Sequence, residues 1–252
     1  MNAPIYPKGT AKALSHSLRV YHGDAVRNAA MDTLYGRFLR PGDLAFDIGS
    51  HVGDRVSSFR RLGARVVALE PQPGPARVLR LIHGRDAQVT LVEAACGDHD
   101  GSITLRINSA NPTVSTASDA FIGAAAEADG WADQVWDHEI AVRCTTLDSL
   151  IARHGMPNLL KIDVEGFEAH VLAGLTRPVP VISFEFTTIQ RDVAEACLAL
   201  LETLGPYRFN LALGESQRLE FDEPASAEAM GGYLRELPHA ANSGDVYATL
   251  ES

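Results

Sequence analysis

The feature of this sequence that most limits its fold is a series of short apolar runs, each followed by polar residues and a segment with helical spacing. Runs that are apolar throughout, such as Val66-Val67-Ala68-Leu69, are typical of strands covered on both faces of a parallel sheet. Alternation of such strands with helices predicts a doubly wound α/β sheet. The expected strands cover Leu44–Ile48, Arg65–Leu69, Val89–Val92, Leu159–Val164 and Val179–Phe186.

Helices are expected between these strands, over Gly53–Leu62, Pro73–His83 and Glu168–Leu175. Gly63 and Gly84 stand where two of these helices should stop, because glycine readily ends a helix. Near the end of the chain, Tyr207–Leu213 and Val246–Leu250 have the composition of strands. A long polar stretch separates them, so the sequence predicts an antiparallel pair at one edge of the sheet.

A length of 252 residues with 46% hydrophobic residues suits one α/β domain around a single sheet, and we expect one domain over residues 1–252. Residues 1–40 are expected to be an N-terminal helical segment. Residues 108–142 change character, with a polar stretch, an alanine-rich segment and the neighbouring Trp131 and Trp136. We interpret this segment as an insertion or a lid over a pocket, and a purely structural helix is the alternative.

The charge distribution disfavours nucleic acids and anionic membranes as partners. The chain carries 22 basic and 32 acidic residues, a net charge of −10, and has no run of Lys or Arg. No stretch approaches the roughly 20 apolar residues that a membrane span needs. The three cysteines show neither metal-ligand spacing nor an even count, which fits a reducing cytoplasm. The sequence does not predict the oligomeric state.

The first chemical motif is Asp47-Ile48-Gly49-Ser50-His51-Val52-Gly53, at the junction of a predicted strand and helix. Glycines there allow a tight turn, and the helix N-terminus offers free N–H groups. A dinucleotide site would instead need G-x-G-x-x-G. The acid at Asp47 suits a ligand with an ammonium and a sulfonium, and Glu70, 23 residues later, closes the next strand where a carboxylate can accept ribose hydroxyls.

Each of these two acids also has an ordinary structural explanation. Asp47 could cap the following helix, and Glu70 could be a solvated strand end. Their joint placement on consecutive strands favours a site for a nucleoside with a cationic tail.

The second motif runs from Leu160 to Glu168 and carries acids at the end of an apolar strand. By the strand period of two, Lys161, Asp163 and Glu165 should share one face, and Lys161 could compensate a neighbouring carboxylate. Parallel strands present their carboxyl ends to the same crevice, so these residues should face Asp47 and Glu70. An acid-rich helix start is the alternative, but it does not explain Lys161 and Asp163 within the strand.

The sequence resembles the FkbM family of S-adenosylmethionine-dependent methyltransferases between about Tyr35 and Phe186. The resemblance is carried by D-x-G-x-x-x-G from Asp47, V-V-A-L-E-P before residue 72, T-T-L-D from Thr145 and L-K-I-D-V-E-G-x-E from Leu160. It implies a class I methyltransferase (Rossmann-like) fold, a mostly parallel seven-stranded sheet with an antiparallel last strand. It also implies methyl transfer, usually to a hydroxyl oxygen.

The resemblance implies a role for each residue in the motifs. Asp47, Gly49 and Gly53 would line the methionine side of the cofactor, and Glu70 its ribose. The same cofactor pocket is expected to include Ser50, His51, Gln72, Cys96 and Asp163. The catalytic candidates are Asp163, Glu165 and His51. The family commonly has Ala-Asn where this chain has Ser50-His51, so His51 either replaces an asparagine hydrogen bond or acts as a base.

The expected reaction is methylation of a hydroxyl on a small molecule, sugar or secondary metabolite. Asp163 or His51 would accept the proton, directly or through water, and Glu165 would orient the acceptor or the methionine end of the cofactor. A divalent cation on Asp163 and Glu185 is chemically reasonable, but it is not favoured because a third oxygen ligand is not obvious, so no metal ligand is assigned. A nicotinamide-dependent oxidoreductase and a non-catalytic cofactor-binding relative are the alternative functions.

Overall fold

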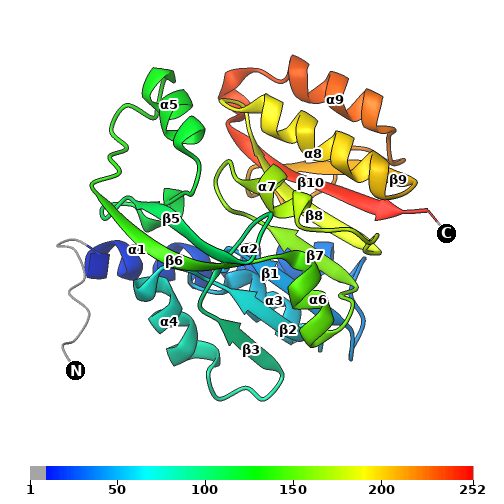
Figure 1. Cartoon of the computed structure of the whole chain (residues 1–252). Helices are drawn as coiled ribbons and strands as arrows, with labels where there is room; N and C mark the ends of the chain where they lie inside the picture. Colours follow the sequence, from blue (N-terminus) through cyan, green and yellow to red (C-terminus); the bar gives the residue numbers. More distant parts are fainter. Residues whose placement is uncertain (1–9, 252) are drawn as a thin grey trace.

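The predicted apolar runs form five adjacent strands of one seven-stranded sheet in the computed structural model, which describes residues 10–251 (Figure 1). The strand order is β3-β2-β1-β7-β8-β10-β9. The strands are β1 (Leu44–Ile48), β2 (Arg65–Leu69), β3 (Val89–Val92), β7 (Leu159–Ile162), β8 (Val181–Thr187), β9 (Tyr207–Leu213) and β10 (Ser243–Leu250). Strand β10 is antiparallel to both of its neighbours, and the other pairs are parallel. The doubly wound sheet that the family resemblance implied is confirmed.

The strand boundaries follow the apolar runs closely. Strands β1, β2, β3 and β9 begin and end where the sequence predicts. Strand β7 ends at Ile162, earlier than expected, because the backbone turns through left-handed conformations at Glu165 (φ 56°) and Gly166 (φ 83°). Strand β10 begins earlier than expected and lies between β8 and the edge strand β9, so the antiparallel pair is also confirmed.

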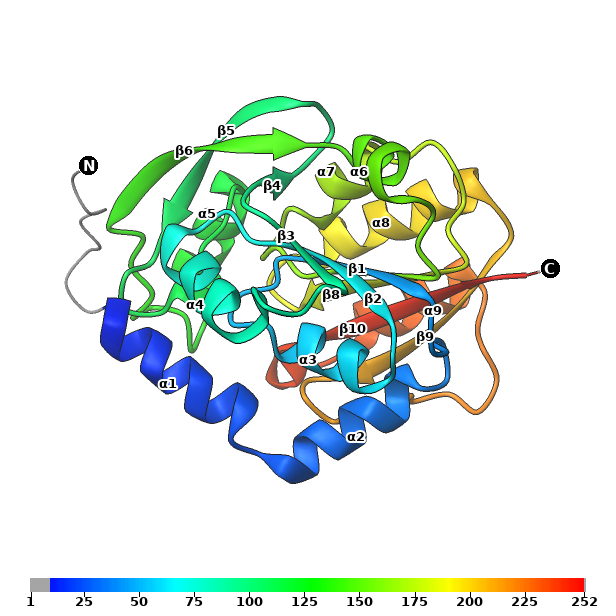
Figure 2. The same cartoon turned by 90° about the horizontal axis from the view of Figure 1, so that it is seen from below.

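Helices cover both faces of this sheet, as Figure 2 shows. One face packs against α2 (Ala25–Tyr35), α3 (Asp54–Arg61) and α4 (Pro73–His83), and the other against α6 (Leu147–His154), α7 (Glu168–Ala173), α8 (Arg191–Leu204) and α9 (Ala227–Glu236). In β1, Phe46 faces the second group of helices, whereas Ala45 faces the first group. Burial on both sides explains why the central strands are apolar throughout.

The expected helices are present with nearly the expected boundaries. Helix α4 matches its prediction, and α3 lies within the predicted Gly53–Leu62. Helix α7 ends at Ala173, two residues early. The described part of residues 1–40 contains α1 (Thr10–His22) and α2, and residues 1–9 lie outside the described chain. Across residues 10–251, no helix combines the length and apolar character needed to cross a membrane.

A second sheet of three strands stands beside the first one, and the sequence analysis did not predict it. It has the order β4-β6-β5 and consists of β4 (Ala95–Cys96), β5 (Gly101–Ile107) and β6 (His138–Thr145). Residues 108–137 link β5 to β6 through the 3-10 helix η1 (Pro112–Val114) and α5 (Asp119–Glu127), and residues 138–142 of the predicted insertion belong to β6. Trp131 and Trp136 both pack edge-on against Phe121 of α5, so they stabilise this segment itself.

The end of β1 fits closely against the end of β7 through Gly49. This residue has φ 86°, and a Cβ atom there would lie 1.8 Å from the carbonyl oxygen of Asp163. The backbone N–H of Asp163 donates a hydrogen bond to Ile48 O at 2.9 Å. Glycine at position 49 therefore lets two strand ends meet at the point where the strand order reverses, between β1 and β7.

Gly49→Ala should lower the free energy of unfolding by at least about 2 kcal/mol, because alanine is strained at positive φ and its Cβ meets backbone. Urea unfolding followed by circular dichroism measures the change. Gly123→Ala is the matched control, because Gly123 lies in α5 with nothing near its missing Cβ, and this change should be neutral or stabilising by up to about 1 kcal/mol. Wild-type stability of Gly49→Ala would contradict this account of the turn.

Candidate active site

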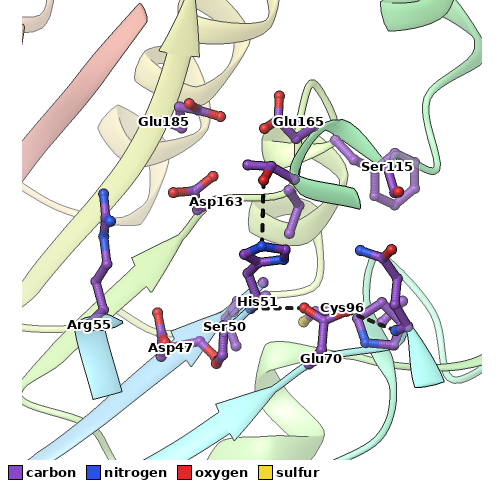
Figure 3. A pocket seen from close by; sticks show the side chains of 18 of the residues that line it. Asp47, Ser50, His51, Arg55, Glu70, Cys96, Ser115, Asp163, Glu165 and Glu185 are labelled. Carbon is purple, nitrogen blue, oxygen red and sulfur yellow. Dashed lines mark hydrogen bonds between the residues drawn. The ribbon is translucent and has the colours of Figure 1, made fainter. Parts of the chain in front are cut away.

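One cavity opens at the carboxyl ends of β1, β2, β7 and β8, where the strand order predicts a ligand site (Figure 3). Loops after these strands supply most of its wall, and Ile103, Leu105 and Thr113 from the second sheet and its connection complete it. The sequence-predicted residues in the lining are Asp47, Gly49, Ser50, His51, Glu70, Gln72, Cys96, Asp163 and Glu165. The chain thus brings together residues from four separate segments.

Gly53 does not line the cavity, so its expected contact with the cofactor stays a prediction. Gly53 precedes α3 and has φ 80°. A Cβ atom at this position would lie 2.5 Å from Leu79 Cδ2 and 3.1 Å from His83 Nε2, closer than side chains normally pack. Leu79 and His83 belong to α4. Gly53 therefore allows α3 and α4 to pack closely, and the spacing of the motif alone could not distinguish packing from ligand contact.

Asp47 ends β1 as a buried carboxyl group that is only 2% exposed. Its Oδ2 atom has no hydrogen-bond partner in the described part of the chain. Burial raises the pKa of Asp47 to about 7. A buried acceptor without a partner is costly, so this oxygen suits a cationic group delivered by a ligand.

Glu70 is held in one orientation by two backbone N–H groups. His51 N donates to its Oε2 at 2.9 Å, and Gln72 N donates to its Oε1 at 2.8 Å. Burial raises the pKa of Glu70 to about 7, although these two hydrogen bonds oppose the shift. Each carboxylate oxygen keeps a free lone pair, so Glu70 can still accept hydroxyl donors from the cavity.

Gln72 and Cys96 support the wall near Glu70. The side chain of Gln72 donates from Nε2 to Pro112 O at 3.0 Å and so ties the loop after β2 to η1. Burial raises the pKa of the Cys96 thiol, which keeps it neutral and unsuited to nucleophilic attack. Figure 3 shows Cys96 beside Glu70, where it offers an apolar surface.

His51 stands in the middle of the cavity with a neutral imidazole at pH 7. Burial lowers the pKa of His51 to about 4. Its Nε2 lies 3.4 Å from Thr113 Oγ1, and its ring meets the edge of Tyr21 with a centroid distance of 6.0 Å. The Nδ1 atom is buried without a partner among the residues described. The ring can therefore give or accept one hydrogen bond with a ligand.

Lys161 is completely buried and lies at the base of the acidic motif. Its Nζ donates to Asp245 Oδ1 at 2.7 Å and to Asp163 Oδ2 at 3.3 Å. Burial lowers the pKa of Lys161, but the carboxylates of Asp163 and Asp245 outweigh it and keep the ammonium charged. Lys161 therefore compensates a neighbouring carboxylate, as the strand pattern predicted.

Three carboxylates meet above this lysine, and we call Asp163, Glu165 and Glu185 the acid triad. One oxygen from each lies within 4.8 Å of the other two, and Figure 3 shows the three groups around one gap. Burial, followed by repulsion from Asp163, raises the pKa of Glu165 and of Glu185 well above the usual range. Burial also acts to raise the pKa of Asp163, but Lys161 and Arg55 outweigh it and lower that pKa.

The backbone conformation that brings Glu165 into the acid triad was not predicted from the sequence. The strand period placed it on the face of Lys161 and Asp163, but β7 ends at Ile162. The left-handed turn at Glu165 directs its side chain into the cavity, and its backbone oxygen accepts from Thr116 Oγ1 at 2.6 Å. The strand period was therefore the wrong reason for the position of Glu165, although this residue lines the cavity as predicted.

Several cavity residues were missed, because they come from segments without a chemical motif. Arg55 of α3 and Glu215 after β9 belong to a network in which Arg27 bridges Asp54 and Glu215, each at 2.8 Å. Arg55 Nη1 lies 2.7 Å from Asp54 Oδ2, and its buried Nε has no partner within residues 10–251. Only the charged residues near the start of α3 hinted at this network in the sequence.

Comparison with known proteins identifies the family. A model of the methyltransferase FkbM domain matches residues 47–216, which is more than half of the chain and includes Asp47, Glu70 and the acid triad. The chain belongs to the FkbM methyltransferase family. An FkbM methyltransferase depends on S-adenosylmethionine, so the resemblance found in the sequence is confirmed. No curated protein matches the chain.

Three solved structures similar to this FkbM protein are distant from it in sequence. They include a TehB-like SAM-dependent methyltransferase from Corynebacterium glutamicum (11% identity, TM-score 0.48, covering 96% of this chain and 97% of that chain). A precorrin-6y C5,15-methyltransferase from Geobacter metallireducens has 17% identity and a TM-score of 0.44, with 90% and 88% covered. An O-methyltransferase from Bacillus cereus in complex with SAH has 12% identity and a TM-score of 0.45, with 95% and 91% covered. These similarities do not bear on the acceptor.

Affinity for S-adenosylmethionine should rise more than about tenfold between pH 5.5 and pH 7. The pKa of Asp47 and of Glu70 is about 7 in the ligand-free protein, so both are mostly protonated at pH 5.5 and must ionise to receive an ammonium or hydroxyl donors. Calorimetric titration across this range measures the effect. An affinity that does not change with pH would show that neither carboxylate takes part.

Proposed function

We propose that this enzyme transfers the methyl group of S-adenosylmethionine to a hydroxyl oxygen of a small molecule, a sugar or a secondary metabolite. The observation that carries the proposal is the joint placement of Asp47, Glu70 and the acid triad around one cavity. The first two suit the donor, whereas the triad offers acceptors for a hydroxyl proton. The family match supports a methyltransferase rather than the nicotinamide-dependent oxidoreductase considered from the sequence.

The donor would lie along the loops after β1 and β2. The partnerless Oδ2 of Asp47 would accept the donor's ammonium, and the two oxygens of Glu70 would accept the ribose hydroxyls. Arg55 has a buried Nε–H without a partner in the described chain, so it could bind the donor's carboxylate. The unpaired atoms of Asp47 and Arg55 and the free lone pairs of Glu70 thus complement the charged groups and hydroxyls of the cofactor.

The acceptor would approach from the side of η1. Thr113 and Ser115 line the cavity there, close in the chain to Thr116, which bonds to Glu165 of the acid triad. Trp136 donates from Nε1 to Val114 O at 2.9 Å, and Gln72 holds Pro112, so this wall is tied to the rest of the site. We retain the interpretation of residues 108–142 as a lid that covers the acceptor.

The chemical step is an in-line displacement in which the cofactor supplies the electrophilic methyl group. The chain must align the hydroxyl oxygen, exclude water and receive the proton. As the new oxygen–carbon bond forms, the hydroxyl becomes strongly acidic, so a weak base suffices. Asp163 in contact with Lys161, or the neutral ring of His51, would accept this proton directly or through water.

Glu70→Ala tests donor binding without any knowledge of the acceptor. Wild-type protein should bind S-adenosylmethionine and not NAD in calorimetry, and the variant should lose at least tenfold in affinity because the ribose loses its acceptor. Glu202→Ala, an exposed glutamate of α8, is the control and should bind like the wild type. No binding by the wild type, or a preference for NAD, would refute the proposed function.

Asp163→Asn should lower kcat at least about 100-fold while the donor Kd changes less than about threefold. The amide keeps the shape of the side chain but cannot take the proton, and Lys161 keeps its bond to Asp245. Turnover is followed with labelled donor on an acceptor found by screening. His51→Asn separates the two candidate bases, because retained turnover there would leave His51 a hydrogen-bonding role. Unchanged turnover of Asp163→Asn would remove Asp163 from the mechanism.

A further inference from the structure

We infer that the acid triad of Asp163, Glu165 and Glu185 binds one divalent metal cation beside the methyl acceptor. This inference rests on the proposed function and adds a metal to the same site. From the sequence, a divalent metal was not favoured because a third oxygen ligand was not obvious. The structure supplies that ligand, because the turn after β7 brings Glu165 to the other two carboxylates.

The geometry is that of a site for a hard cation. One oxygen from each residue lies within 4.8 Å of the others. Two oxygens bound to Ca²⁺ at about 2.3–2.6 Å can be about 5 Å apart, so Ca²⁺ fits with little movement. Mg²⁺ binds oxygen at about 2.0–2.1 Å and would draw the carboxylates slightly closer. Carboxylate-only donors favour Ca²⁺, Mg²⁺ or Mn²⁺ over softer metals.

Unpaired carboxylates provide the second, independent observation. Glu165 is only 7% exposed, and no side chain or backbone group within residues 10–251 donates a hydrogen bond to its carboxylate. The Oε2 atom of Glu185 is buried and also lacks a donor in the part of the chain that is described. Buried carboxyl oxygens without partners are unfavourable unless something compensates them, and the charged form in particular needs a cation.

The chain itself supplies too little positive charge for this role. Lys161 is the cation in hydrogen-bonding contact with the triad among the described residues, and it contacts only Asp163. Its shorter bond, at 2.7 Å, goes to Asp245, which lies outside the triad. A divalent cation would supply the missing charge and would leave coordination positions open towards the cavity for water and the acceptor.

The cation would act on the acceptor hydroxyl. Coordination of that oxygen lowers its pKa, so the O–H bond breaks and the proton passes to water or to His51. The oxygen lone pair then forms a bond to the methyl carbon, while the sulfur–methyl bond breaks and its electron pair returns to sulfur. The products are the methyl ether and S-adenosylhomocysteine. In this arrangement Asp163 is a ligand rather than the proton acceptor.

Titration of the full chain with Mn²⁺, followed by electron paramagnetic resonance of the free ion, tests the site directly. We expect one equivalent of Mn²⁺ to bind. Mg²⁺ and Ca²⁺, each added separately to the Mn²⁺ complex, should displace it. Glu165→Gln and Glu185→Gln should each weaken binding at least tenfold, because each replaces a charged ligand by an amide. Glu70→Gln is the matched control, a buried glutamate of the same cavity outside the triad, and should keep Mn²⁺ affinity within about threefold.

Thermal unfolding provides a second readout that does not depend on activity. Metal should raise the Tm of the wild type but not that of Glu185→Gln, which should be at least as stable as the metal-free wild type because it relieves repulsion in the triad. Loss of Mn²⁺ binding with retained S-adenosylmethionine binding would mark the triad as the metal site. The absence of one-equivalent Mn²⁺ binding by the wild type, or equal binding by Glu185→Gln, would overturn the inference and leave the methyltransferase proposal intact.

Discussion

The buried ammonium of Lys161 is the interaction on which the site depends. It lies within the sheet on β7 and reaches Asp245 on β10, across the intervening strand β8, while it also contacts Asp163. The ion pair therefore links the parallel part of the sheet to its antiparallel strand at the edge of the cavity. Removal of one partner from a buried pair costs about 3–5 kcal/mol, so position 161 has little freedom to change. The contact with Lys161 also holds Asp163 at the cavity wall, where we propose that donor and acceptor meet.

Other acids of the cavity are buried by the fold, and burial makes their charged forms unfavourable. Burial raises the pKa of Asp47 and of Glu70 to about 7. A carboxyl whose pKa is raised by folding stabilises the folded protein while it is protonated, and this contribution is lost as pH rises through about 7. The empty site is therefore least stable when it is most negative. A cationic ligand reverses this penalty, which couples binding to stability.

The second sheet and its connection give the cavity its outer wall. Thr116 Oγ1 donates to Glu165 O at 2.6 Å, so the connection between β5 and β6 is tied to the acid triad. Gln72 ties the same connection to the loop that carries Glu70. A movement of this segment would therefore affect both Glu70 and the acid triad. These two hydrogen bonds connect the proposed lid to the proposed donor and acceptor sides of the cavity.

The sequence by itself determined the main sheet and two acids of the cavity. Burial on both faces favours apolar residues, which made β1 and β2 recognisable, and residues at strand ends must face the switch point, which placed Asp47 and Glu70. Strand β5 was missed although Ile103 and Leu105 alternate with polar residues, because one exposed face weakens the pattern. Only the tertiary structure placed Glu165 beside Glu185, moved Gly53 into helix packing and brought Arg55 to the cavity. These outcomes depend on a left-handed turn and on contacts between distant segments, and local periodicity carries no information about either.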